Sequence, residues 1–299
     1  MPADETTKVD PSRRALLVGG LAAASGAAIA VCTARSQTAP DPMAGHDMSA
    51  ISADPYAAPM SGMAHGNMTT VGRVDHDANG FDPSVMLTDW DTGTTALLPD
   101  GRTLRTFEVS AVDREIEIAP GIFFPAWTFN GRVPGPALRA KEGERLKIIF
   151  RNYGSHPHSM HFHGIHSARM DGVPGAGLIG PGEEFIYEFD AKPFGCHLYH
   201  CHALPLKRHM HKGMYGLSVI DPDPARQSDP ALSAVAASRV LGSPENANWQ
   251  ELAMVMNAFD TNFDGGNEVY ACNTVGQAYM NVPIRIDKTK PVRIYLLNV

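Results

Sequence analysis

The chain has 299 residues, enough for about two domains of roughly 150 residues each. Hydrophobic residues make up 43% and charged residues 19% of the sequence, a balance that excludes a wholly disordered chain. The formal net charge of -7 and the lack of a long basic run argue against a nucleic-acid binder. Four cysteines are too few for a disulfide-built fold, whereas 13 histidines and 14 methionines suggest metal chemistry.

Residues 1–34 resemble an export signal of the twin-arginine type. Arg13 and Arg14 precede an uncharged, Ala/Gly-rich apolar run over residues 15–31. Glycine dilutes this run, and it is shorter than the roughly 20 strongly apolar residues that a membrane span needs. We therefore predict an exported, periplasmic protein that has no stable membrane span once the signal is removed.

Residues 35–105 are predicted to form a flexible linker and lead-in. The first part of this range is rich in Ala, Pro, Met, Gly and Ser and has no apolar periodicity. Its soft side chains are Met43, Met48, Met60, Met63, Met68, His46 and His65. Because thioethers and imidazoles bind Cu(I) well, copper acquisition is the alternative to a linker without a specific role.

From residue 106 onward, short apolar runs are separated by Gly and Pro, a pattern typical of the strands of a β-sandwich or barrel. The only competing helical pattern of note is a short one across residues 229–240. The sequence therefore predicts an all-β fold.

The strand region also contains an internal repeat. Residues 107–152 and 251–298 show the same order of strands and turns, and Asn152 aligns with Asn298. The predicted divisions are a first β-domain over residues 106–222, a linker over 223–250 and an incomplete second β-domain over 251–299. Half of a sandwich leaves sheet edges and one core face uncovered, so we expect the chain to continue in nature or to depend on a partner.

Ten of the 13 histidines lie between residues 156 and 211, in two groups. The residues whose spacing suggests ligands are His158, His161 and His163 in the first group and His200, Cys201, His202, His209 and Met214 in the second. Side chains alternate along a strand, so His200 and His202 face one side while Cys201 faces the other. By the same rule His161 and His163 share a face, and His158 is free to point the opposite way.

This alternation predicts two metal sites. Two imidazoles, a thiolate and a thioether come from His158, His209, Cys201 and Met214, and this is the ligand set of a blue electron-transfer copper. Zinc is the competing metal, but structural zinc sites usually show paired spacings such as Cys-x2-Cys. The opposite face offers four imidazoles for further copper, from His161, His163, His200 and His202. Cys201 then gives a short covalent path between the two sites.

These motifs resemble those of the multicopper oxidases, the laccase-like family, and in particular its small two-domain form. His-x-x-His-x-His-Gly is matched from His158 to Gly164, and His-Cys-His followed by His-x4-Met is matched from His200 to Met214. The resemblance spans residues 106–299. It implies a cupredoxin-like Greek-key β-sandwich, with one complete domain plus the first strands of a second, assembled as a homotrimer.

The resemblance also implies a role for each ligand. The type 1 copper is held by His158, Cys201, His209 and Met214, the type 2 copper by His161, and the type 3 pair by His163, His200 and His202. Electrons from a phenol-like reductant or Cu(I) then reduce dioxygen to water at the catalytic histidines His161, His163, His200 and His202. The family's cluster takes eight histidines from two domains and this chain supplies four, so we expect the chain alone to be inactive.

Two alternatives remain open. Copper nitrite reductases resemble the chain at His158, His163, His200 and Cys201. That family, however, carries a carboxylate where this chain has His161 and no ligand where it has His202. A non-catalytic copper or electron carrier explains the type 1 ligands but leaves the four remaining histidines without a role.

Other polar residues are not expected to be ligands. His156, His166, His197 and His211 lie near the sites but off the matching spacing, and no disulfide is predicted between Cys196 and Cys272. The segment from Asp260 to Gly265 begins like a calcium loop, but Ala271 stands where such a loop needs a glutamate. We therefore predict a turn between strands there.

Overall fold

The computed structural model describes residues 72–299, so the predicted export signal and the Met/His-containing linker up to residue 71 lie outside the described residues. The strands are β1 (Trp90–Asp91), β2 (Thr94–Leu97), β3 (Thr103–Ala119), β4 (Ile122–Phe129), β5 (Ala137–Lys141), β6 (Arg145–Asn152), β7 (His161–Phe162), β8 (Glu184–Asp190), β9 (Gly195–His200), β10 (Tyr215–Asp221), β11 (Gln250–Phe259), β12 (Val269–Cys272) and β13 (Val292–Asn298). The short helices are α1 (His76–Asn79), α2 (Pro83–Met86), α3 (Leu206–His211), α4 (Pro230–Ala237) and α5 (Ala278–Asn281). Over residues 72–299, none of the helices is long and apolar enough to cross a membrane.

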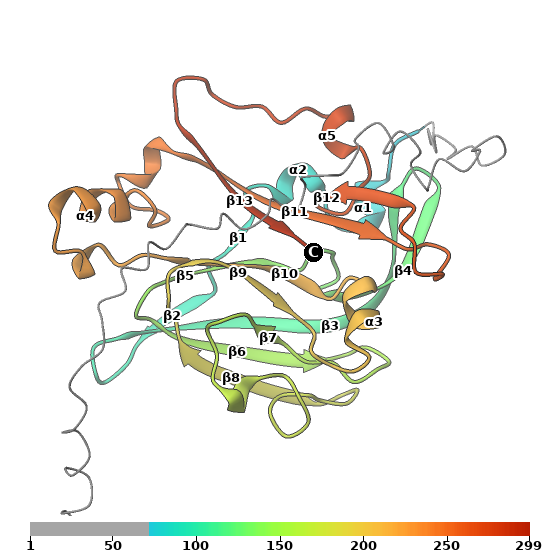
Figure 1. The fold of residues 1–299 in the computed structure, drawn as a ribbon, viewed down its shortest axis with the longest axis horizontal. Helices are drawn as coiled ribbons and strands as arrows, with labels where there is room; N and C mark the ends of the chain where they lie inside the picture. The colour runs from blue at the N-terminus through green and yellow to red at the C-terminus, as the bar shows by residue number, and fades with distance from the viewer. Residues whose placement is uncertain (1–71) are drawn as a thin grey trace, which may run out of the picture. The chain divides into compact units, whose positions relative to one another are not determined.

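Two sheets form the first sandwich (Figure 1). One has the strand order β1-β5-β10-β9-β7, and the other has the order β2-β3-β6-β8 with β4 paired to β3. Buried and half-buried residues alternate along β6, and its buried Leu146, Ile148 and Phe150 belong to the core of the sandwich. The all-β, cupredoxin-like fold predicted from the sequence is confirmed. The same core contains Cys201 and Met214, so two of the predicted ligands lie inside the sandwich.

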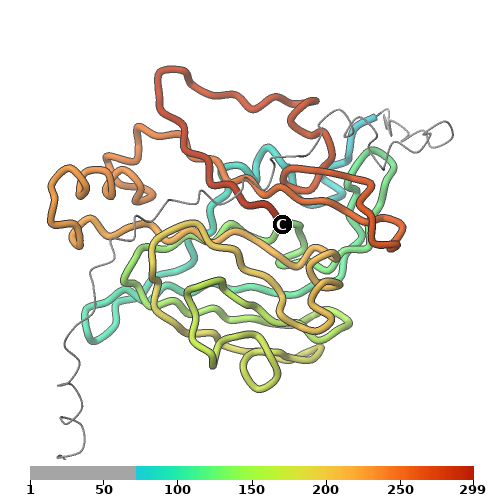
Figure 2. Tube along the Cα trace, in the orientation of Figure 1, coloured from blue at the N-terminus to red at the C-terminus, as the bar shows by residue number. Residues whose placement is uncertain are grey.

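A third sheet, with the order β12-β11-β13, packs beside the first sandwich (Figure 2). β11 pairs with β13 in parallel and with β12 antiparallel, as β3 pairs with β6 and β4. A second core joins Leu217 and Val219 of β10 to Val255 and Phe259 of β11. β10 is buried along its whole length because its residues contribute to both cores.

The two segments predicted as linkers are folded where the structure describes them. Residues 72–105 contain α1, α2, β1 and β2, and Phe81 and Met86 are buried in the second core. The described lead-in part of residues 35–105 is therefore folded, because its apolar side chains enter this core. In the segment 223–250, α4 begins where Asp229 accepts a hydrogen bond from the backbone of Ala231.

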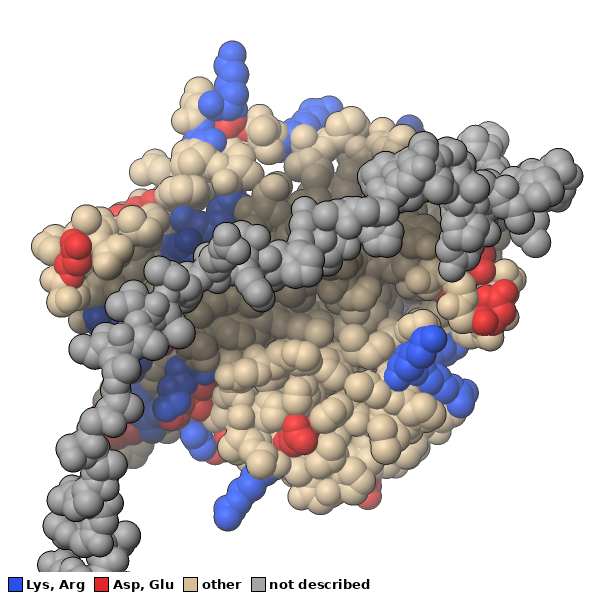
Figure 3. Space-filling model, in the orientation of Figure 1, with Lys and Arg blue, Asp and Glu red and all other residues tan. Residues whose placement is uncertain are grey.

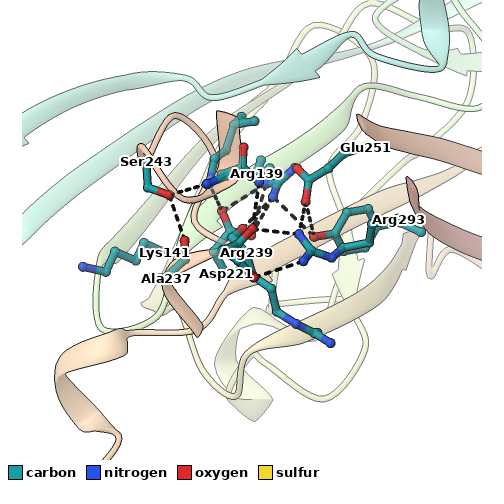
Figure 4. A network of polar contacts seen from close by, with 12 residues as sticks. Arg139, Lys141, Asp221, Ala237, Arg239, Ser243, Glu251 and Arg293 are labelled. Carbon is teal, nitrogen blue, oxygen red and sulfur yellow. Dashed lines mark hydrogen bonds and ion pairs between the residues drawn. The ribbon is translucent and has the colours of Figure 1, made fainter. Parts of the chain in front are cut away.

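A buried ion-pair network joins the third sheet to the first sandwich (Figure 4). Arg139 of β5 is 1% exposed, and its guanidinium donates to Asp221 of β10 over 2.9 Å and to Glu251 of β11. Arg293 and Tyr295 of β13 donate to the second oxygen of Glu251. Each buried charge thus has a partner of opposite charge. Removing one partner would leave the other charge buried and unpaired, which is unfavourable.

Replacing Arg139 with methionine is expected to lower the free energy of unfolding by about 3–5 kcal/mol, because Asp221 would remain buried without its partner. Urea denaturation of the full chain measures this loss. Arg145→Met is the matched control, since Arg145 pairs with carboxylates at the surface and should cost less than about 1 kcal/mol. Equal losses in both variants would contradict a special role for the buried network.

Candidate metal centre

The inner cluster consists of His158, Cys201, His209 and Met214. His158 lies in the loop after β6, Cys201 directly follows β9, His209 is on α3, and Met214 directly precedes β10. The amide of Cys201 donates to the carbonyl of Met214 over 3.0 Å. This hydrogen bond brings the two ends of the segment that contains α3 together. All four side chains are buried, and none of these residues is more than 4% exposed.

Three donor atoms of the inner cluster converge on one point. Cys201 Sγ lies 3.3 Å from His209 Nδ1 and 3.8 Å from His158 Nδ1, and the two nitrogens are 3.3 Å apart. Donor atoms that share an ion at about 2.0–2.3 Å lie between about 3 and 4 Å from one another. The cluster therefore fits a metal ion, and a set of imidazole, thiolate and thioether donors suits copper.

Burial keeps the inner imidazoles neutral. It is the main cause that lowers the pKa of His158 to about 4 and that of His209 to about 4. Both rings therefore have a free nitrogen lone pair at neutral pH. Burial also raises the pKa of the Cys201 thiol, so the thiolate needs a cation to stabilise it.

The outer cluster consists of His161, His163, His200 and His202. β7 pairs antiparallel with β9, and this places His161 directly opposite His200. The Nε2 atoms of His163 and His200 are 2.8 Å apart, and the rings of His161 and His202 are separated by 4.4 Å. The structure thus places Cys201 in the inner cluster and its two neighbours in the outer one.

Hydrogen bonds orient the outer imidazoles. The carbonyl of Asp171 lies 3.0 Å from His161 Nδ1 and 2.9 Å from His202 Nδ1, and the carbonyl of Cys201 lies 2.8 Å from His200 Nδ1. A carbonyl accepts, so each of these Nδ1 atoms carries the proton. The Nε2 lone pairs are then free for a metal ion. Burial also lowers the pKa of His200 to about 4, which keeps this ring neutral.

Asp171 is a site residue that the sequence interpretation missed. Its carboxylate lies 2.9 Å from His161 Nδ1, and His166 Nε2 lies 3.7 Å from the same oxygen. A carboxylate therefore lies beside the four imidazoles of the outer cluster. Asp171 falls in a loop that has no strand or helix periodicity, and the only local signal is the Asp-Gly pair formed with Gly172.

The remaining histidines flank the two clusters. His156 packs against Trp127 with ring centroids 4.4 Å apart, and His197 donates to the carbonyl of Pro193. His211 lines a cavity beside α3. The structure thus separates these three from the converging donor atoms, whereas His166 contacts the outer cluster.

The remaining cysteines and the segment from Asp260 to Gly265 lie outside the two clusters. Cys196 and Cys272 are free cysteines, so no disulfide joins them. Asp260 accepts hydrogen bonds from the backbone amides of Asp264 and Gly265, and its carboxylate therefore stabilises a turn between β11 and β12.

The known proteins that this chain resembles are copper proteins. Residues 114–225 match the family described as "Multicopper oxidase". A solved structure titled "Crystal structure of multicopper oxidase" is 45% identical, covers 76% of this chain and 74% of that chain, and has a TM-score of 0.66.

Two curated relatives carry different activities in their names. A multicopper oxidase of Cercospora beticola is 39% identical over 39% of this chain and 19% of its own length. A copper-containing nitrite reductase of Neisseria meningitidis is 32% identical over 38% of this chain and 30% of its own length. The matches thus span less than a third of either relative, and both relatives imply copper as the cofactor.

Proposed function

The chain belongs to the multicopper oxidase family, and we propose that it is an oxidase that reduces dioxygen to water with electrons from a phenol-like reductant or Cu(I). One observation carries this proposal: Cys201 lies in the inner cluster, while its neighbour His200 converges with His161 and His163, and the ring of its other neighbour, His202, lies 4.4 Å from that of His161. A single chain segment therefore joins two groups of copper-binding side chains.

The inner cluster would hold the type 1 copper. His158, His209 and Cys201 supply the close donors, and Met214 supplies the weaker thioether. When bound there, copper supplies reversible one-electron chemistry. The protein surroundings exclude water from this site, because all four ligands are buried in or against the core of the sandwich.

The outer cluster would hold part of a type 2 and type 3 copper group, with His161 as the type 2 ligand and His163, His200 and His202 as type 3 ligands. His163 is exposed, so the cluster is accessible to side chains of another domain. We propose that a second domain or a neighbouring subunit of a homotrimer completes it. Export through the twin-arginine signal would place the assembly in the periplasm.

Nitrite reduction is the second candidate function. It is favoured by the Asp171 carboxylate beside His161, because such a group can hold a proton near a bound nitrite, and by the nitrite reductase relatives. The presence of His202 in the outer cluster favours the oxidase, since a mononuclear site does not need a fourth imidazole.

Parallel assays separate the candidates. The copper-loaded protein, in the assembled form in which a second domain or a neighbouring subunit completes the outer cluster, is supplied with a phenolic reductant, and oxygen uptake and nitrite consumption are measured under matched conditions. An oxidase consumes oxygen and leaves nitrite unchanged when oxygen is excluded. Nitrite consumption alone would favour the second candidate, and copper binding without either activity would favour a carrier.

Replacing Asp171 with asparagine is expected to weaken copper binding by the outer cluster by about 10- to 100-fold, because the carboxylate orients His161. Competition with a chelator measures this affinity, and the blue colour of the inner site should be unchanged. Asp190→Asn is the control, since Asp190 pairs only with surface cations. Unchanged outer-site affinity in the Asp171 variant would show that the carboxylate does not position the ring.

A further inference from the structure

A cavity of about 730 Å³ lies between α3 and the turn that joins β11 to β12. Lys207, Arg208 and Lys212 line one wall, and Pro125 and Phe263 contribute apolar surface. This volume is in the range of pockets that enclose small organic molecules. We name it the α3 cavity.

The cations of the α3 cavity share one side of the helix. Lys207 and His211, and likewise Arg208 and Lys212, are four residues apart and therefore neighbours on the helix surface. Like charges at this spacing repel, and within residues 72–299 no carboxylate lies within ion-pair distance of Lys207, Arg208 or Lys212. Lys and Arg side chains project on the side of the molecule where Figure 1 shows α3 (Figure 3). Lys207, Arg208 and Lys212 thus present positive charge to the cavity without a direct ion-pair partner in the described part of the chain, and Asp113 is a carboxylate close enough to act on Lys212.

The two acidic residues of the cavity, Asp260 and Asp264, keep their negative charge but form no ion pair with Lys207, Arg208 or Lys212. Asp260 accepts backbone hydrogen bonds from Asp264 and Gly265, and Asp264 accepts one from Gly266. Both carboxylates therefore serve the turn between β11 and β12.

An aromatic ring also lines the cavity, in contact with Lys212. Phe263 is 58% exposed and stacks on Phe124 at a centroid distance of 5.8 Å, with Lys212 Nζ 4.9 Å above its ring. Its φ of 57° is in the left-handed region, which is unfavourable for a bulky residue. The backbone thus holds an apolar ring in solvent at an energetic cost, as is common where a ring serves a binding site.

One aromatic side chain lies between the α3 cavity and the inner cluster. The ring of Trp127 is 4.8 Å from that of His209, and the Arg208 guanidinium lies 5.1 Å over the same Trp127 ring. A molecule in the cavity is therefore separated from His209 by about one layer of side chains.

We propose that the α3 cavity binds a small aromatic anion, with the ring against Phe263 and a sulfonate or carboxylate against Lys207, Arg208 and Lys212. The volume of the cavity suits a small organic molecule. Binding of the anion does not depend on the proposed function. The further step, that the bound anion is the reductant, rests on that function.

Binding is tested on the copper-free full chain by calorimetry with naphthalene-2-sulfonate. We expect saturable binding at low salt that weakens as salt is added, and weaker binding of the neutral naphthalene-2-methanol. Arg208→Glu should lower the affinity for the sulfonate at least about tenfold, as loss of one charge-assisted contact does. Lys207→Glu serves as a second variant, and Phe263→Ala should lower the affinity for both naphthalenes.

Lys288→Glu is the matched control, because Lys288 is exposed in a loop outside the α3 cavity, and it should leave the affinity unchanged. Equal affinity for the neutral and the anionic naphthalene would overturn the proposal. So would unchanged binding in the folded Arg208 and Lys207 variants, equally tight binding of inorganic sulfate, or no binding of the sulfonate by the wild type. Sulfonate binding by an assembled, copper-loaded protein that reduces neither oxygen nor nitrite would instead refute the proposed function and leave the cavity assignment intact.

Discussion

Replacing Cys201 with serine is expected to abolish the visible absorption of the copper-loaded protein completely. The strong absorption of a blue copper site comes from a bond between Cu(II) and a thiolate, and serine offers no sulfur. His158 and His209 remain within 3.3 Å of each other, so the variant can still bind a metal ion. Visible spectroscopy at matched copper content measures the effect.

The other two described cysteines provide the controls. Cys196 lies on β9 and Cys272 on β12, and neither belongs to the groups of converging donor atoms within residues 72–299. Cys196→Ser and Cys272→Ser should therefore leave the colour intact. A blue Cys201→Ser protein, or a colourless Cys196→Ser protein, would refute the assignment of the inner cluster.

The inner and outer clusters could be predicted from the sequence because strand geometry has a fixed period. Alternation along a strand predicted that His200 and Cys201 separate, and they do, although β9 ends at His200 and Cys201 and His202 lie in the segment directly after it. His158 lies in the loop before β7, so the path of that loop sets its position relative to His161. Alternating apolar residues such as Leu146 and Ile148 predicted the strands in the same way.

Asp171 could not be predicted by this reasoning. It follows a short 3-10 turn, and its contacts with His161 and His202 depend on how the loop folds back against β7. Gly172 makes this return possible, because its φ of 81° is left-handed and an added Cβ would lie 2.8 Å from a backbone oxygen. No period in the sequence encodes such a path.

The junction between the first sandwich and the third sheet also escaped prediction. Arg139 and Glu251 are separated by 112 residues, and nothing near either residue indicates its partner. The folded state of residues 72–105 has the same cause, since Phe81 and Met86 are buried by strands that come much later in the chain. Local patterns predict the elements, but the contacts between distant elements depend on tertiary packing.

Replacing His161 and His202 together with alanine is expected to remove copper from the outer cluster while the inner site still fills and remains blue. The two rings lie 4.4 Å apart on the face opposite Cys201, and neither contributes a donor atom to the inner cluster. Oxygen uptake by the assembled protein should fall by more than about 100-fold, because two ligands are lost rather than one orienting contact.

Copper counting beside visible spectroscopy distinguishes this outcome from general damage. The variant should keep one copper per chain with the wild-type absorption, and its inner site should still be reduced by an added electron donor. His197→Ala is the matched control, since that ring donates to the carbonyl of Pro193 and lies outside both clusters. Loss of the blue colour in the double variant would mean that the two clusters are not independent. Full oxygen uptake in the double variant would mean that dioxygen is reduced elsewhere.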